Sequence, residues 1–173
     1  RVGELVTAAL AFEAVRFAYP DGTVALQGVD LSLEAGQRVA LLGPNGAGKS
    51  TLMLHANGIL AAGSGRVRVG STLLDPDTLA AVRARVGLVF QDPDDQLFMT
   101  SLDEDVAFGP RNMGLPADEV RRRVDAALEA VGLAGLGERP GPDLSFAQKK
   151  RAALATVLAM APVVLILDEP TSN

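Results

Sequence analysis

Apolar and polar residues alternate in three segments of the first half of the chain, which is the pattern of strands with one buried face. The segments are Ala11 to Phe17, Ala25 to Leu33 and Arg66 to Val69. Between the first two lies Tyr19-Pro20-Asp21-Gly22, a sequence typical of a turn. The pattern predicts a small antiparallel layer of strands.

Three other segments are short and continuously apolar, as expected for parallel strands that are covered on both faces. They are Arg38 to Leu42, Val86 to Phe90 and Val163 to Leu167. The first leads into a glycine-rich segment, and the last leads into two acidic residues. Strands of this kind predict an α/β fold with a parallel sheet.

Three helices are expected, over Lys49 to Leu60, Ala117 to Val131 and Ser145 to Met160. Gly132 stands just past the second of these, where helices commonly end. The run Arg121 to Arg123 on the second helix is interpreted as a solvated face. The apolar residues of that helix share one face; they are Val120, Val124, Ala127, Leu128 and Val131.

Composition narrows the class of protein. With 173 residues, 48% of them hydrophobic and 21% charged, the chain suits one soluble globular domain. The net charge of -5 argues against a general nucleic-acid surface, because such surfaces need clustered Lys and Arg. The chain has no Cys and His55 is its single histidine, so disulfides, thiolate metal sites and multi-histidine metal sites are excluded. A chain without Cys also fits a reducing cytoplasm.

No segment of the sequence is predicted to cross a membrane. The longest charge-free apolar stretch, Ala152 to Leu167, is shorter than the ~20 residues of a spanning helix, and it contains Pro162. The first residues lack the pattern of a secretory signal. Association with a membrane is therefore expected to be peripheral, through a partner.

A glycine-rich loop is the strongest candidate binding site. Gly43-Pro44-Asn45-Gly46-Ala47-Gly48-Lys49-Ser50 matches the pattern of a phosphate-binding loop between a strand and a helix. In such a loop, backbone N–H groups and the positive end of the helix dipole face phosphate oxygens. Lys49 can contact the β and γ phosphates, and the Ser50 hydroxyl can bind Mg²⁺. The loop predicts ATP binding. Tyr19 is a candidate for stacking on the base, although its spacing alone favours an ordinary turn aromatic.

Two carboxylates end the last apolar strand, a costly place for charge unless a cation or a proton transfer compensates. Asp168 is predicted to hold Mg²⁺, and Glu169 is predicted to orient and deprotonate an attacking water. A solvated loop is the alternative. Gln91 follows another buried strand, where its amide could reach a metal-bound water, but a strand-terminal Gln is also commonly a surface residue.

Ser145 and Gln148 have the spacing of a capping box at the start of the helix that runs to Met160. A capped helix start is also a site for anions, so the same atoms could serve a phosphate. The sequence leaves both interpretations open.

Taken together, these motifs resemble those of the ATP-binding-cassette (ABC) ATPases, in the order and at the spacing of that family. The motifs are Gly43 to Ser50, Gln91, Leu144 to Gln148 and Leu167 to Thr171. The resemblance implies an α/β fold, a P-loop NTPase core with a parallel sheet, accompanied by an antiparallel β subdomain and an α-helical subdomain.

The resemblance also implies a division of the chain into parts. Residues 1–173 would form one incomplete ATPase domain. Within it, residues 1–90 would be the nucleotide-binding core with the β subdomain, residues 91–150 the helical subdomain, and residues 151–173 the return to the core.

Carried over by position, the resemblance implies roles for single residues. Tyr19 is similar to the aromatic that stacks on adenine. Gly43 to Thr51 would form the Walker A loop, with Gln91 as the Q-loop residue, Asp168 as the Walker B metal ligand and Glu169 as the glutamate that polarises water. ATP and Mg²⁺ would be the ligands.

The partners implied by the resemblance are a second ATPase subunit and a membrane protein. In this family two ATPase subunits, identical or different, enclose two ATP molecules. The helix that begins at Ser145, with Gln148, would therefore contact nucleotide bound by the partner subunit. One chain would supply half of each site.

A narrower resemblance, to the ATPases of energy-coupling-factor importers, including the cobalt and nickel systems, rests on three further segments. They are Phe90 to Phe98, Glu104 to Pro110 and Gln148 to Arg151. In such importers the stretch after the Q-loop touches a membrane coupling protein at the cytoplasmic face, which makes Leu97, Phe98 and Met99 candidates for docking. Burial inside the helical subdomain is the alternative. Other subunits select the transported substrate, a metal ion or a vitamin.

The sequence departs from the family pattern at two places. Phe146 and Ala147 replace two glycines of the signature Leu-Ser-Gly-Gly-Gln, and their Cβ atoms obstruct a close approach to the opposing γ-phosphate. The sequence stops at Asn173, before the family's next strand, which inserts between the Walker A and Walker B strands, and before its switch histidine. His55 cannot replace that histidine, because it lies on the helix after the phosphate loop.

We therefore expect a C-terminally truncated domain that is unstable or hydrolyses ATP slowly when isolated. Two other functions remain as alternatives to a transport ATPase. One is a nucleotide-binding module without hydrolysis, and the other is a non-transport ABC ATPase of DNA repair or translation.

Overall fold

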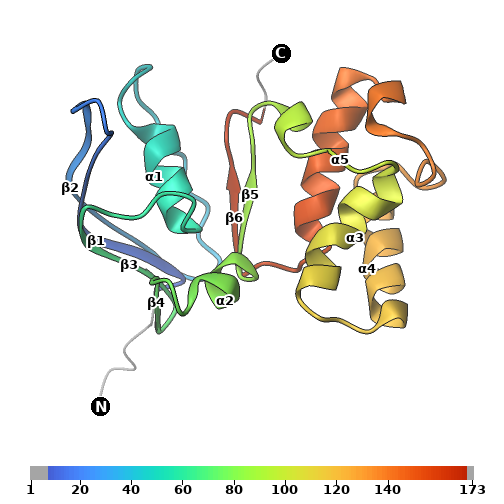
Figure 1. Ribbon diagram of the computed structural model, residues 1–173, viewed down its shortest axis with the longest axis horizontal. Helices are drawn as coiled ribbons and strands as arrows, with labels where there is room; N and C mark the ends of the chain where they lie inside the picture. The colour runs from blue at the N-terminus through green and yellow to red at the C-terminus, as the bar shows by residue number, and fades with distance from the viewer. Residues whose placement is uncertain (1–7, 171–173) are drawn as a thin grey trace. The chain divides into compact units, whose positions relative to one another are not determined.

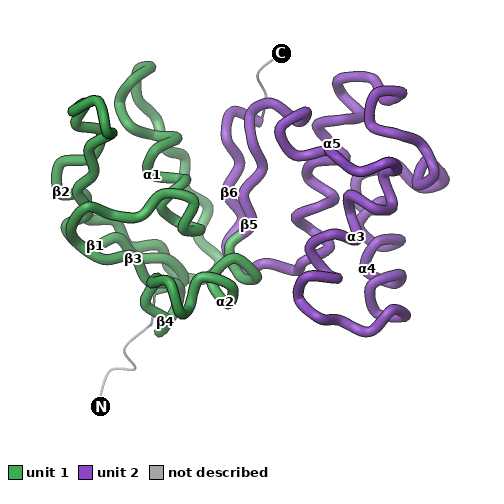
Figure 2. The backbone as a smooth tube through the Cα atoms, in the orientation of Figure 1, with its two compact units in different colours: residues 1–86 green, residues 87–173 purple. Residues whose placement is uncertain are grey.

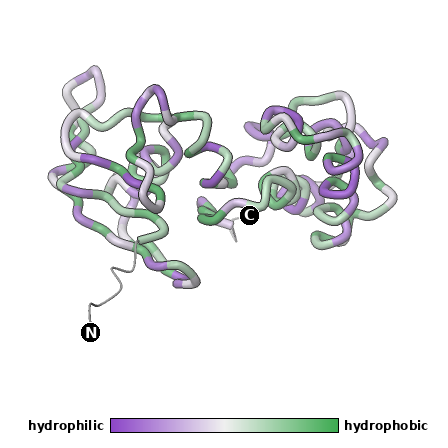
Figure 3. Tube along the Cα trace, turned by 90° about the horizontal axis from the view of Figure 1, so that it is seen from below, coloured by the Kyte–Doolittle hydropathy of each residue, from purple (hydrophilic) through white to green (hydrophobic). Residues whose placement is uncertain are grey.

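The computed structural model describes residues 8–170, and the chain divides into two compact units, residues 1–86 and 87–173 (Figures 1 and 2). Within each unit the hydropathy of the chain changes repeatedly between apolar and polar along the trace (Figure 3). Thr171 and Asn173, named above, lie outside the described residues. The division of the domain at residues 90 and 150 stays a prediction.

The first unit contains the predicted antiparallel layer. Its strands are β1 (Leu10–Ala18), β2 (Val24–Leu33), β3 (Ser64–Val69) and the short β4 (Thr72–Leu73), in the order β2-β1-β3-β4. All three pairings are antiparallel, and Phe12 of β1 lies opposite Leu31 on one side and Val67 on the other. The turn between β1 and β2 is closed by a hydrogen bond from Gly22 N to Tyr19 O, so the predicted turn is confirmed.

Helix α1 (Lys49–Ala56) follows the phosphate loop and contacts β2. It ends four residues before the predicted end at Leu60, because Gly58 adopts a left-handed conformation with φ of 71° that stops the helix. The five-residue helix α2 (Leu79–Arg83) was not predicted. Its Arg83 donates hydrogen bonds to the carbonyls of Asn57 and Gly58, which satisfies acceptors at the end of α1.

The predicted strand from Arg38 to Leu42 is wrong. These residues have no strand conformation and are exposed, Val39 by 57% and Leu42 by 87%. A strand forms only beside a hydrogen-bonding neighbour, and within residues 8–170 none of the strands pairs with this segment. The resemblance implied that, in the family, a further strand lies between the Walker A and Walker B strands.

The second unit contains a two-stranded parallel sheet of β5 (Val86–Val89) and β6 (Val164–Leu167); only Val86 lies in the first unit (Figure 1). All four residues of β5 are buried, as predicted. In β6, by contrast, Leu165 and Leu167 are exposed, so the prediction of two covered faces is wrong for this strand. Here a continuous apolar run located the strand correctly but did not report which of its faces other elements cover.

Three helices form the remainder of the second unit: α3 (Leu102–Asn112), α4 (Ala117–Ala130) and α5 (Phe146–Leu158). Two 3-10 turns, η1 (Pro93–Asp95) and η2 (Gly141–Asp143), precede α3 and α5. The predicted helices α4 and α5 are confirmed, and their apolar faces share one core with α3. That core includes Leu102, Val106, Val120, Val124, Leu128, Ala152 and Ala155.

Helix α3 was missed because Pro110 lies inside it, and proline disfavours a helix interior. A helix-start signal was nevertheless present in the sequence. The Ser101 side chain accepts a hydrogen bond from Glu104 N, and three acidic residues, Asp103, Glu104 and Asp105, occupy the first turn.

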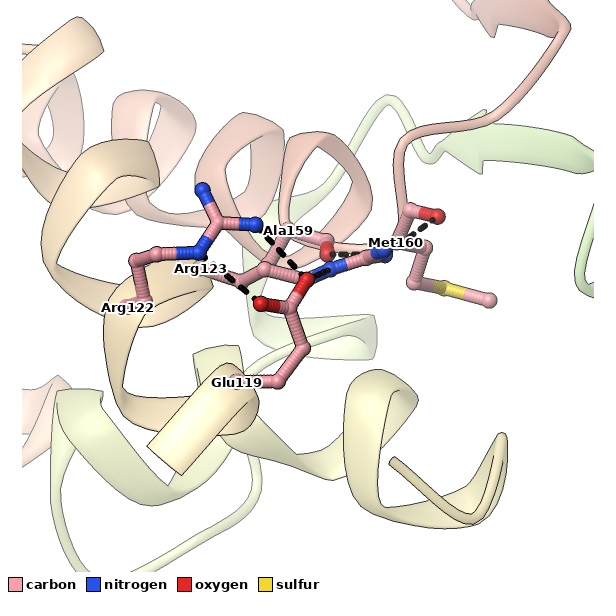
Figure 4. A network of polar contacts seen from close by, with 5 residues as sticks. All are labelled: Glu119, Arg122, Arg123, Ala159 and Met160. Atoms are coloured by element: carbon pink, nitrogen blue, oxygen red, sulfur yellow. Dashed lines mark hydrogen bonds and ion pairs between the residues drawn. The ribbon is translucent and has the colours of Figure 1, made fainter. Parts of the chain in front are cut away.

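Two arginines join α4 and α5 reciprocally. Arg123 of α4 donates to the carbonyls of Ala159 and Met160 at the end of α5, at 3.4 and 3.3 Å (Figure 4). Arg151 of α5 donates to the carbonyls of Val131 and Gly132 at the end of α4, at 3.0 and 3.3 Å. Each cation thus lies at the negative end of the other helix's dipole.

The solvated-face interpretation of Arg121 to Arg123 is therefore wrong for Arg123, although Arg121 and Arg122 are exposed. Glu119 receives hydrogen bonds from Arg122 at 2.7 and 2.8 Å and from Arg123 Nε at 2.7 Å (Figure 4). These bonds, first from Arg122 and then from Arg123, lower the pKa of the Glu119 carboxyl to about 2.

A pH dependence of stability follows from this network. Because the folded-state pKa of Glu119 is about 2 against an ordinary value of 4.5, ionised Glu119 stabilises the fold above about pH 4.5. This stabilisation is lost as the pH falls from about 4.5 through 2. Glu119→Gln should therefore destabilise the full-length protein at pH 6 and have little effect near pH 2, in urea unfolding at a series of pH values.

The control for this experiment is Glu129→Gln, which removes an exposed carboxylate from the same helix. Its effect should be small and flat between pH 6 and 2. A destabilisation by Glu119→Gln that persists unchanged at pH 2 would contradict the lowered pKa.

Candidate functional site

The phosphate loop lies in the first unit and immediately precedes α1 along the chain. Residues 43–47 are exposed, and Gly48 is the N-cap residue of α1, with φ of 86°. As a glycine, Gly48 has no side-chain oxygen to accept from the N–H groups of the first helical turn. No side chain caps these donors, which lie at the positive end of the helix dipole, the arrangement that binds phosphate.

Gly48 also lies too close to β2 for any side chain. A Cβ atom built on it would be 2.6 Å from the carbonyl oxygen of Ala25 and 3.3 Å from the Leu26 side chain. Both the contact and the left-handed backbone therefore require glycine at this position.

The Lys49 ammonium is held by the loop itself. Its Nζ donates to the carbonyl oxygens of Gly43 at 2.8 Å and Pro44 at 2.9 Å. These acceptors are neutral, whereas a phosphate oxygen is charged and forms a stronger hydrogen bond with an ammonium. The cation is thus positioned at the loop, where an anionic ligand would compete successfully for it.

Tyr19 belongs to a group of four residues beside the loop, which we term the aromatic cluster: Phe17, Tyr19, Thr51 and His55. The Tyr19 hydroxyl bonds to Thr51 Oγ1 at 2.8 Å, and its ring meets Phe17 edge to face at 5.0 Å. Phe17 in turn meets the His55 ring at 4.7 Å. The ring of Tyr19 is half-buried, so part of it remains accessible to a base.

His55 closes this cluster from within α1. It is fully buried, and its Nδ1 lies 2.7 Å from the carbonyl oxygen of Thr51, which can only accept, so Nδ1 carries the proton. Its Nε2 has no hydrogen-bond partner among the described residues. His55 therefore contacts Phe17 and Thr51 from α1.

The acidic strand end lies in the second unit. The backbone N of Asp168 donates to the carbonyl of Val89 at 3.0 Å, which holds the end of β6 against the end of β5. Asp168 is half-buried and Glu169 is exposed. Glu169 has φ of 44°, a left-handed conformation that costs a non-glycine residue about 1–3 kcal/mol; Ala14 and Ala161 adopt the same conformation elsewhere in the chain.

Gln91 is exposed and follows β5 by two residues. Because β5 and β6 are parallel neighbours, Gln91 and Asp168 both follow carboxyl ends of strands at one edge of the sheet. Of the predicted magnesium ligands, Ser50 belongs to the first unit, whereas Gln91 and Asp168 belong to the second.

The predicted capping box at the start of α5 is confirmed. Ser145 Oγ accepts from Gln148 N at 3.3 Å, and Gln148 Oε1 accepts from Ser145 N at 2.8 Å. Phe146 is 49% exposed, and the Lys150 ammonium lies 5.2 Å from the centre of its ring. The two side chains that replace the signature glycines, Phe146 and Ala147, are thus both on the surface of the helix start.

Of the three candidates for docking after Gln91, one packs into the core and one is exposed, so neither alternative, docking or burial, applies to all of them. Leu97 packs against the core of the second unit, whereas Phe98 is 62% exposed. Phe98 meets Phe108 of α3 edge to face at 5.1 Å, and Phe108 is itself exposed. Met99 is half-buried. The sequence analysis missed Phe108, because the helix that carries it was not predicted.

Two features are absent from the part of the chain that the structure describes. Residues 8–170 contain no group of three or more His, Cys, Asp or Glu side chains that could hold a metal ion. None of the helices within those residues is long and apolar enough to cross a membrane.

Comparisons with known proteins agree with this geometry. Residues 26–172 match the ABC transporter family. The chain is 59% identical over 157 residues to a protein of Streptomyces avermitilis provisionally described as an ABC transporter ATP-binding protein, covering 91% of this chain and 60% of the relative. It is 53% identical to the energy-coupling factor transporter ATP-binding protein EcfA of Methanothermobacter thermautotrophicus, covering 91% of this chain and 51% of that protein.

A solved structure supports the same assignment. The chain superimposes on cbiO1 from Clostridium perfringens, described as part of the ABC transporter complex cbiONQ, with a TM-score of 0.83 and 47% identity. The match covers 96% of this chain and 67% of cbiO1.

The chain belongs to the ABC transporter family, and its fold is that of the family's nucleotide-binding domain. The prediction of family and fold class is thereby confirmed. The chain spans about three fifths of the length of the Streptomyces relative.

Proposed function

We propose that the protein is the ATP-binding and ATP-hydrolysing subunit of an ABC importer of the energy-coupling-factor type. The observation that carries this proposal is the phosphate loop, in which an uncapped helix start, a glycine-only contact and the Lys49 ammonium are combined. The similarity to EcfA and cbiO1 supports the type of transporter.

The loop supplies only part of the binding energy for ATP. A helix terminus contributes at most ~2 kcal/mol, whereas micromolar affinity requires about 8 kcal/mol. Lys49 adds a full charge on the β and γ phosphates. Tyr19, held by the aromatic cluster, adds stacking on the adenine, for ~1–3 kcal/mol. The backbone of the loop is shaped by its glycines together with Pro44, Asn45 and Ala47. Thr51 adds a backbone N–H donor in the first turn of α1.

Hydrolysis is assigned to the acidic strand end. Glu169 accepts a proton from the water that attacks the γ-phosphate and orients that water. Ser50, Gln91 and Asp168 present a hydroxyl, an amide and a carboxylate, the hard oxygen donors that suit Mg²⁺ with phosphates and water as its other ligands. When bound, Mg²⁺ neutralises charge on the β and γ phosphates.

A second ATPase subunit, identical or different, would complete each site. The resemblance places Ser145 and Gln148, at the start of α5, against the partner's nucleotide, and in this chain the side chain of each accepts a hydrogen bond from the backbone N of the other. Phe146 and Ala147 limit how closely that helix start approaches the phosphate.

The membrane partner is assigned to the exposed pair of Phe98 and Phe108, with Leu97 and Met99 beside it. An exposed aromatic pair suits an apolar segment of a membrane-embedded subunit, and the protein would lie peripherally at the cytoplasmic face. Import of a metal ion such as cobalt or nickel, or of a vitamin, is the transport process proposed.

Lys49→Ala tests the proposal. The variant should lose ATP affinity by about 10- to 100-fold, because it removes a charge-assisted hydrogen bond worth roughly 1.5–3 kcal/mol. Titration of the full-length protein with ATP by calorimetry measures this. Arg38→Ala, which removes an exposed cation from the same unit, is the matched control and should bind as the wild type does. Unchanged affinity of Lys49→Ala would remove the basis of the proposal.

A nucleotide-binding module without hydrolysis is the second candidate, favoured by Phe146 and Ala147 at the signature positions. Phosphate release separates the two candidates. A full-length dimer that binds ATP but releases no phosphate with its membrane partners present would establish the second.

A further inference from the structure

The side chain of Gln96 attaches the segment that carries Gln91 to α5. Its Oε1 accepts from the backbone N of Phe90 at 3.2 Å. Its Nε2 donates to the carbonyl of Ala153 at 2.9 Å and to Thr156 Oγ1 at 2.7 Å, both on α5. All of these residues lie in the second unit.

The chemistry of this contact requires a carboxamide. The acceptor oxygen faces a backbone N–H, and the amino group faces two oxygens. Thr156 uses its own hydroxyl proton on the Ala153 carbonyl, at 2.8 Å, so its oxygen is available only as an acceptor for Gln96. A carboxylate of the same shape would place an acceptor against both oxygens.

The hydrogen bonds of Gln96 hold the chain next to Gln91. Phe90 immediately precedes Gln91, so the bond from Phe90 N to Gln96 closes the loop of residues 90–96 around Gln91. A second contact between this loop and α5 is the ion pair of Asp94 with Lys149 at 2.7 Å, but Asp94 is largely exposed. Exposed ion pairs are weak, so the hydrogen bonds of Gln96 hold the loop to α5 more strongly than the Asp94–Lys149 ion pair does.

We propose that Gln96 is a positioning residue for ATP hydrolysis, which keeps the loop carrying Gln91 in a fixed position relative to α5, the helix that begins at Ser145. The proposal rests on the proposed function, in which Gln91 contacts the magnesium site and α5 contacts the partner's nucleotide. Gln96 itself touches neither. It makes the two nucleotide-contacting elements of this unit move together.

The test uses Gln96→Glu in the full-length protein with MgATP. The maximal rate of hydrolysis should fall by about 10- to 100-fold, because small displacements of a positioned group have effects of that size. The KM for ATP should change less than about twofold, because the phosphate loop and Tyr19 lie in the other unit.

Thr156 supplies a second, milder test with its own control. Thr156→Val removes the acceptor at nearly constant volume and should lower the rate in the same direction, whereas Thr156→Ser keeps the acceptor and should retain the wild-type rate. Asp94→Asn, which removes the exposed ion pair, should have little effect. If Gln96→Glu does not fold, the Thr156 pair decides.

A purely structural role for Gln96 would lower the melting temperature and leave the maximal rate unchanged, and that result would overturn the proposal. Equal, wild-type rates for Thr156→Val and Thr156→Ser would overturn it as well. Glu169→Gln distinguishes failure of this inference from failure of the proposed function. If Glu169→Gln is inactive while Gln96→Glu is fully active, the inference about Gln96 fails and the proposed function stands.

Discussion

Glu169→Gln is expected to reduce ATP hydrolysis by at least about 100-fold while leaving ATP affinity intact, because general-base catalysis contributes roughly 10²–10⁴-fold. Gln has the size of Glu but cannot accept a proton from the attacking water. The phosphate loop belongs to the other unit and is unchanged by this substitution. Phosphate release and ATP titration, both on the full-length protein, measure the two effects.

The matched control is Glu129→Gln, an exposed glutamate of α4 outside the proposed site. It should hydrolyse ATP at the wild-type rate. Wild-type hydrolysis by Glu169→Gln would favour the alternative that the acidic strand end is a solvated loop.

Gly48→Ala is expected to abolish measurable ATP binding, with a loss greater than about 100-fold, equivalent to more than about 2.7 kcal/mol. The new Cβ would lie 2.6 Å from the Ala25 carbonyl, and φ at this position is 86°. A backbone carbonyl in β2 cannot move away without disturbing the strand, so the loop and the start of α1 must shift instead. Titration with ATP and thermal unfolding would record the loss of binding and the accompanying destabilisation.

Gly36→Ala is the control for Gly48→Ala, because it introduces the same backbone strain without a contact like that between the new Cβ and Ala25. Gly36 also has a left-handed conformation, with φ of 79°, but no heavy atom of the described chain lies within 4 Å of the position that a Cβ atom would take there. Gly36→Ala should lower the free energy of unfolding by only the roughly 1–2 kcal/mol that backbone strain costs, and it should keep the wild-type affinity for ATP. Equal loss of affinity in both variants would show that the contact with Ala25 is unimportant.

Periodicity in the sequence predicted the elements whose stability is local. Alternation placed β1, β2 and β3, and helical spacing placed α4. A continuous apolar run placed β5 and the capping-box spacing placed the start of α5, whereas the two-residue β4 was not predicted. The segment Arg38 to Leu42 failed because strand formation depends on a neighbour, which the run of apolar residues does not encode. Helix α3 was missed because Pro110 outweighed the start signal at Ser101.

The site divides in the same way. The phosphate loop and the capping box are contained in a few consecutive residues, so their geometry could be predicted. The bond from Tyr19 to Thr51 joins positions 32 residues apart, and the bond from Gln96 to Ala153 joins positions 57 apart. Such contacts depend on how distant segments pack, and no spacing rule in one sequence reveals them.

The hydrogen bond from Asp168 N to Val89 O has a consequence for how the gene can vary. Adjacent residues of a strand point to opposite sides, so inserting or deleting one residue within β6 would turn the side chain of Asp168, which directly follows the strand, to the other side of the sheet. An even change of length would preserve the directions but displace both carboxylates along the sheet. The length of β6 is therefore as tightly constrained as the identity of the two acids that follow it.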